Sequence, residues 1–204
     1  MSITQFTDSD KPTTTRLNQM ISEINSQLTG LGGALITELV SFDQMTGVDG
    51  TVTLSGFSSE GYKEVIITGT LRNHTGSTYE QAQMRFNGVT ASTYQWFYYQ
   101  RGTLDVEEEN YNVDYFRLGP VPPVAVVTED HSFTCRINFG TDFQLVQIDS
   151  YLYHDTGGGI SHQFGKTLGM ADFSQPGPDY YLDQVDIFTA SLIEGAQVTI
   201  YGVK

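Results

Sequence analysis

The sequence is poor in cysteine and in basic residues, and it has no long hydrophobic run. Cys135 is the one cysteine, so no disulfide forms within the chain. The 10 basic residues against 24 acidic residues give a formal net charge of −14, which repels phosphate backbones and anionic lipid surfaces. No run reaches the roughly 18 apolar residues of a transmembrane helix, and residues 1–8 lack the basic and apolar regions of a signal peptide. We therefore expect synthesis in a cytosol, no membrane insertion and no nucleic-acid partner.

Catalytic motifs are absent from the sequence as well. It contains no Gly-x-Ser-x-Gly, no His-Glu-x-x-His, no phosphate-binding glycine loop and no paired cysteines. We therefore expect a protein without enzymatic activity and without a cofactor. A glycosidase needs only two carboxylates at a suitable distance, which sequence spacing does not reveal, so glycan cleavage remains an alternative.

Two polar segments hold metal-ligating residue types. His154, Asp155 and His162 flank a glycine turn and offer imidazole and carboxylate ligands for zinc. The acidic run from Asp105 to Asn110 offers oxygen ligands for calcium, but it lacks the alternation and the turn glycine of a dedicated calcium loop. Both segments are typical of solvated polar chain, so we expect no bound metal.

The sequence does contain a short heptad near its start. Its apolar residues, spaced 4, 3, 4 and 3 apart, form one seam, comprising Leu17, Ile21, Ile24, Leu28 and Leu31. A single helix cannot bury this seam against itself, and the mixture of Ile and Leu favours three strands over two, so the sequence predicts a homotrimer. An amphipathic helix packed on its own domain has the same spacing and remains an alternative.

Glycines predict where this helix ends. Thr13 or Thr14 can cap its beginning, and Gly30, Gly32 and Gly33 end it after about Thr29 and form a hinge. We therefore divide the chain into an N-terminal arm with an oligomerising helix, residues 1–33, and a β domain, residues 34–204.

From residue 34 onward the hydrophobic period changes from 3.6 to 2. In the run from Tyr79 to Phe86, for example, Ala82, Met84 and Phe86 share one face. Turn residues such as Asn87-Gly88 separate the runs and predict hairpins. The clearest strand-like runs are residues 51–57, 62–72, 79–86, 94–101, 111–118, 124–128, 132–139, 143–153, 181–190 and 197–203. Strands of this number and spacing predict a mainly β fold, an antiparallel β-sandwich of the jelly-roll type.

One predicted strand is unusually aromatic. The run from Tyr94 to Gln100 holds five aromatic residues, including the one tryptophan, and places them on both faces. Aromatic side chains on both faces indicate burial on both sides, or one exposed face that packs at a subunit interface or stacks on sugar rings. The candidate ligand or interface residues are Tyr94, Trp96, Tyr98 and Tyr99.

Several segments carry characteristic strand and turn signatures, at residues 62–72, 84–88, 151–153, 165–167 and 195–202. Together these segments resemble bacteriophage virion proteins, and the opening at residues 12–18 is similar to the start of other phage appendage proteins. The resemblance covers most of residues 10–204 and consists of strand and turn signatures rather than a chemical site. It departs from the plain pattern at the acidic run 105–110 and at the glycine-rich segment 154–162.

The resemblance implies a role that composition and spacing do not. It implies a non-enzymatic virion structural protein, assembled in the host cytoplasm, most simply a trimeric tail fibre or appendage. Its N-terminal arm would attach to other virion proteins of the tail or capsid. The alternatives are a capsid decoration protein of the cement or head-fibre type, and a module that binds glycan on the host surface.

Overall fold

The structure is a computed structural model that describes most of the predicted β domain. The described residues are 36–44, 50–74, 79–90, 93–102, 105–121, 130–139, 144–155, 160–171, 181–190 and 193–204. The predicted N-terminal helix, its seam of Leu17, Ile21, Ile24, Leu28 and Leu31, and the glycine hinge lie outside these residues. They remain predictions from the sequence. No helix among the described residues is long and apolar enough to cross a membrane.

The described part is built from β-strands, which confirms the mainly β prediction. Its twelve strands are β1 (Ile36–Gln44), β2 (Val52–Ser55), β3 (Glu64–His74), β4 (Glu80–Phe86), β5 (Tyr94–Arg101), β6 (Val106–Val113), β7 (Phe116–Val121), β8 (Asp130–Phe139), β9 (Gln144–Asp155), β10 (Ile160–Ala171), β11 (Gln184–Phe188) and β12 (Ile193–Val203).

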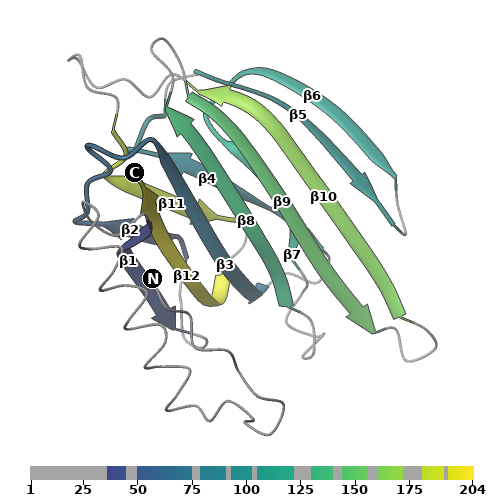
Figure 1. The fold of residues 1–204 in the computed structure, drawn as a ribbon. Coiled ribbons are helices and arrows are strands. Elements are labelled where there is room, and N and C mark those ends of the chain that lie inside the picture. The colour runs from purple at the N-terminus through teal and green to yellow at the C-terminus, as the bar shows by residue number, and fades with distance from the viewer. Residues whose placement is uncertain are drawn as a thin grey trace, which may run out of the picture. The chain divides into compact units, whose positions relative to one another are not determined.

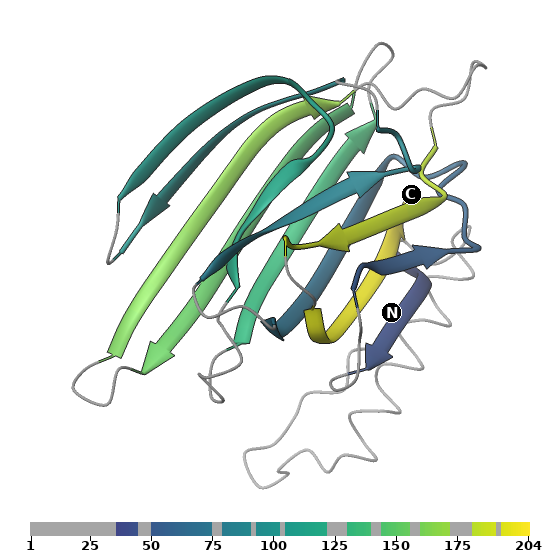
Figure 2. The same cartoon turned by 180° about the vertical axis from the view of Figure 1, so that it is seen from behind.

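These strands form two antiparallel sheets that face each other. The large sheet has the order β1-β12-β3-β8-β9-β10-β5-β6, and the small sheet has the order β2-β11-β4-β7. Figures 1 and 2 show the small sheet covering one face of the large sheet. The chain crosses repeatedly between the sheets, and the apolar faces of both contribute to one core. The predicted antiparallel β-sandwich is therefore correct at this level.

The strand that the sequence predicted at residues 94–101 is β5, and its side chains alternate as a half-exposed strand requires. Tyr94 and Phe86 pack with Phe116 of β7, with ring centroids 5.1 and 5.8 Å from that of Phe116, so aromatic rings join the two sheets. The Tyr94 hydroxyl accepts a hydrogen bond from the Phe86 backbone N–H at 3.0 Å. Burial raises the pKa of Tyr94 to about 12, so this hydroxyl stays protonated and partnered in the core.

The inner face of β10 consists of small residues, and it lies beside the large inner residues of β5. In the register of the two strands, each large residue is opposite a small one: Tyr94 with Ala171, Trp96 with Gly169, Tyr98 with Thr167, and Gln100 with Gly165. A Cβ added at Gly165 would lie 2.9 Å from the Tyr98 hydroxyl oxygen. The rings of β5 therefore occupy space that side chains on β10 would otherwise fill.

Some sequence predictions of individual strands were wrong. Residues 111–118 were predicted as one strand, but Asp114 and Tyr115 separate β6 from β7, which lie in different sheets. The acidic run 105–110 was not predicted as a strand, but most of it belongs to β6, an edge strand on which Glu107 and Glu109 are exposed. Asn87 and Gly88 have positive φ as predicted, at 51° and 62°, yet their turn joins β4 to β5 across the two sheets rather than closing a hairpin.

Candidate binding face of the large sheet

The candidate residues of β5 separate onto the two faces of the large sheet. Tyr94, Trp96 and Tyr98 point inward and are buried, whereas Tyr99 lies on the outer face. The Trp96 indole N–H donates to the Tyr115 carbonyl oxygen at 2.8 Å, so its polar atom is also satisfied inside the sandwich. The surface that could meet a ligand is therefore formed by the alternate residues of β5 and their neighbours.

The outer face of the large sheet carries a cluster of exposed apolar side chains. The exposed fractions are 64% for Tyr111, 51% for Leu145, 46% for Leu168, 39% for Met170 and 37% for Phe97. They come from β6, β9, β10, β10 and β5 and are neighbours through the strand register, which pairs Phe97 with Leu168 and Met170 with Leu145. Contiguous exposed apolar surface of this kind marks binding sites on soluble proteins.

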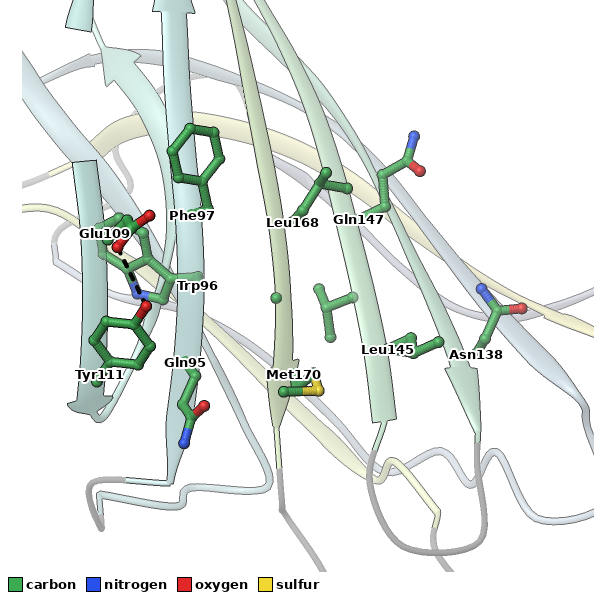
Figure 3. A pocket seen from close by; sticks show the side chains of 12 residues that line it. Gln95, Trp96, Phe97, Glu109, Tyr111, Asn138, Leu145, Gln147, Leu168 and Met170 are labelled. Carbon is green, nitrogen blue, oxygen red and sulfur yellow. Dashed lines mark hydrogen bonds between the residues drawn. The ribbon is translucent and has the colours of Figure 1, made fainter. Parts of the chain in front are cut away.

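These side chains border a hollow of about 520 Å³, which we call the outer-face hollow. Figure 3 shows it crossing the strands, with Phe97, Leu168 and Gln147 in one row and Gln95, Met170, Leu145 and Asn138 in the next. Its size falls within the range of small-ligand sites, which combine an apolar lining with a few polar groups. The lining residues are Gln95, Trp96, Phe97, Glu109, Tyr111, Asn138, Leu145, Val146, Gln147, Leu168, Gly169 and Met170.

The polar groups of the hollow are mainly amides. Gln95 and Asn138 are exposed, and neither side chain hydrogen-bonds to another described residue. The Gln147 amide N–H donates to Asp149 at 2.8 Å, which leaves its amide oxygen as an acceptor. At the edge of the hollow the Tyr111 hydroxyl donates to Glu109 at 3.2 Å, and this hydrogen bond to a carboxylate raises the pKa of Tyr111.

A second aromatic cluster lies along the same face. Tyr99 and Tyr151 flank Phe164, with ring centroids 5.9 and 5.1 Å from that of Phe164. Between this cluster and the hollow, Lys166 pairs with Asp149 at 3.5 Å. Along this face, rows of apolar side chains therefore alternate with a row in which a positive and a negative charge balance, although the whole chain is strongly acidic.

The acidic side chains of β6 and the residue before it are paired rather than gathered around a shared centre. Asp105 and Glu107 both pair with Arg101, at 2.8 and 3.3 Å. Glu108 faces inward and pairs with Arg117, whose guanidinium lies 4.4 Å from the centre of the Tyr98 ring. No group of three or more histidine, cysteine or acidic residues within the described ranges could hold a metal ion. The side chains of His154, Asp155 and His162 lie outside what the structure describes.

Sequence reasoning named Trp96 as a candidate and Glu109 within the acidic run, but it missed the other residues that line the outer-face hollow. Leu168 and Met170 lie on β10, a strand that was not predicted because its inner face is Gly165, Thr167, Gly169 and Ala171, which gives no apolar alternation. A signal was nevertheless present, since Leu168 and Met170 are apolar residues at alternate positions and the residues between and beside them are small. That pattern indicates an exposed apolar face rather than a buried one.

Comparisons with known proteins assign no family. No protein-family model matches the sequence, and no curated protein matches it. Structures of infectious bursal disease virus are weakly similar: the Gx strain at 14% identity and a TM-score of 0.11, and the Gt strain at 13% identity and a TM-score of 0.12. Each match covers 82% of this chain, and the chain spans 40% and 41% of those longer chains. At these TM-scores the similarity carries no argument about fold or function.

Proposed function

We propose that this chain is a non-enzymatic structural protein of a bacteriophage particle, a trimeric tail-associated appendage. In this proposal residues 1–33 form the arm and helix that attach the protein to other virion proteins and join three copies. The sandwich is a jelly-roll domain that projects from the attachment point. The sequence resemblance to phage appendage proteins motivates the location, and the strand order supports the domain type.

The strand order is the observation that carries the proposal. A jelly roll has eight strands in two sheets, connected as two Greek keys, and occurs in viral capsid and lectin domains. In the small sheet, β2-β11-β4-β7, strands from early and late in the sequence alternate, as they do in one sheet of a jelly roll. In the large sheet, the pairs β3-β8 and β5-β6 correspond to the four strands of the second jelly-roll sheet. The β9–β10 hairpin is inserted between these two pairs. We interpret β1 and β12 as an extension at the far side of β3.

The trimer is tested by placing charge in the predicted seam. Ile21→Asp with Ile24→Asp would bury two carboxylates between helices, so we expect the trimer to dissociate. Sedimentation equilibrium at micromolar concentration should give three times the 22.6-kDa chain mass for the unmodified protein and the single-chain mass for the variant.

The matched control is Ser22→Asp with Ser26→Asp, which adds the same charge to the same helix away from the seam. We expect this control to remain trimeric. An unmodified chain that sediments as a monomer, or a seam variant that stays assembled, would contradict the assignment of the seam as the main contact.

Two alternatives remain within the same class of particle protein. A capsid decoration protein also needs a symmetric β domain and an attachment segment, and no described residue favours the tail over the capsid. A module that binds glycan on the host surface is favoured by one specific feature, the outer-face hollow, because it combines exposed rings with side-chain amides.

A further inference from the structure

We propose that the outer-face hollow binds a neutral oligosaccharide, which lies across the strands from β6 to β8. This inference rests on the glycan-binding alternative and deepens it, because it names the ligand class of the hollow, and it does not depend on where the protein is attached. It rests on the shape, the chemistry and the charge of the hollow.

The shape of the hollow suits an extended ligand. Its lining comes from five adjacent strands in the order β6, β5, β10, β9 and β8. At about 4.8 Å between neighbouring strands, the hollow extends about 19 Å across the sheet. A path of this length accommodates several linked sugar rings, whereas a single small ligand would fill only part of it.

The chemistry of the hollow matches the two kinds of surface that a sugar ring presents. A pyranose has an apolar C–H face and a rim of hydroxyl groups. Tyr111 and Phe97 offer exposed rings, which Figure 3 draws nearly face-on, and such rings stack on apolar faces. The amides of Gln95, Asn138 and Gln147 provide both donors and acceptors for hydroxyl groups.

The charge of the hollow selects a neutral ligand. Glu109 is the one ionisable carboxylate in the lining, and the lining includes no lysine or arginine. The chain as a whole has a formal net charge of −14, which repels sulfated, phosphorylated or uronic-acid polymers at long range. An anionic chain would therefore find no cationic partner in the hollow.

A second copy of the chain fits this surface less well. A two-fold contact places the same patch against itself, so the hollow would face another hollow rather than a protruding complementary surface. A head-to-tail contact needs a complementary apolar surface elsewhere. Outside the hollow, the large exposed apolar side chains of the described residues are Tyr151 in the second aromatic cluster, Ile36 at the edge strand β1, and Tyr79 before β4. These residues do not form one second patch.

The test is a glycan array probed with the purified full chain, followed by calorimetric titration of the best neutral oligosaccharide. Tyr111→Ala removes an exposed ring and should weaken binding about tenfold or more, equivalent to roughly 1.4 kcal/mol. Phe97→Ala should act in the same direction. Tyr111→Phe keeps the ring, loses only the hydrogen bond to Glu109, and should retain most of the affinity.

The matched control is Thr199→Ala, on the outer face but outside the hollow, which should bind within about twofold of the unmodified chain. Circular dichroism and melting of each variant verify folding. Absence of binding to any neutral glycan, binding only to anionic glycans, or binding unchanged by both ring deletions would overturn the proposal. A Leu168→Asp chain whose mass by sedimentation differs from that of the unmodified chain would also overturn the proposal, because the hollow would then be a contact between copies.

Discussion

Lowering the pH from 7.5 to 5 is expected to reduce the free energy of unfolding by about 2 kcal/mol through His131 alone. His131 lies on the inner face of β8 and is fully buried between the sheets. Its ring stacks on that of Phe133 with centroids 6.1 Å apart, and a Cβ at Gly119 of β7 would lie 3.1 Å from its Nε2. This burial removes the ring from the solvent that stabilises a charged imidazole.

Burial lowers the pKa of His131 from its ordinary value of 6.5 to about 4 in the folded protein. Between these two pH values the unfolded chain binds a proton that the folded chain does not. Stability is therefore complete above about pH 6.5 and is lost as the pH falls toward 4. The expected loss of unfolding free energy is smaller at pH 5 than at pH 4. We choose pH 5 because it lies above the sequence pI of about 4.4, where a protein without net charge tends to precipitate.

Urea unfolding at pH 7.5 and pH 5 measures this contribution. The loss of unfolding free energy between the two pH values is compared between the unmodified chain and the His131→Leu variant. The leucine variant should lose about 2 kcal/mol less, because it has no imidazole to protonate. Cys135→Ala is the control, since Cys135 is buried on the same face of β8 and burial raises the pKa of its thiol further above this range. It should keep the full pH dependence. Equal losses of unfolding free energy in the unmodified and leucine chains would show that His131 does not cause this pH dependence.

Replacing Gly169 by valine is expected to destabilise the sandwich by about 3 kcal/mol. A Cβ at this position would lie 2.4 Å from the Gln95 carbonyl oxygen and 2.5 Å from the Phe116 ring. The first clash is with the backbone of the neighbouring strand and the second with the opposite sheet, so neither is relieved by rotating a long side chain. Both the β5–β10 pairing and the contact between sheets must shift.

Thermal unfolding should show this cost as a melting temperature lower by about 6 to 12 °C for a domain of this size. Ser132→Ala is the control, because Ser132 is exposed on the outer face of β8, and it should change the melting temperature by about 2 °C or less. A Gly169→Val chain that melts with the unmodified protein would show that β10 does not lie against β5 and β7 as described.

Local sequence patterns predicted the side-chain orientation within single strands well. In β4, Ala82, Met84 and Phe86 are buried on one face as the alternation indicated. These positions follow from a period of two residues, which is a property of one strand. The sandwich class followed from the number of such runs and from the absence of helical periodicity among them.

The candidate site was not predictable in the same way, because it depends on which strands are neighbours. The hollow joins Tyr111 and Gln95 of β6 and β5 to Met170, Leu145 and Asn138 of β10, β9 and β8, two groups of strands that β7 separates in the sequence. No local pattern states that β10 pairs with β5. The aromatic run of β5 predicted candidate binding residues that lie mostly on its inner face, whereas the exposed surface of β5 is formed by the residues between them.

Immunogold electron microscopy of purified phage particles, with antibody raised against the isolated chain, tests whether the protein is part of the virion and where it lies. We expect the protein to remain with the particles through purification and the label to gather at the tail. Label spread over the capsid would move the protein to the decoration alternative. Particles that carry no label and contain no copy of the chain by mass spectrometry would contradict a structural role in the virion.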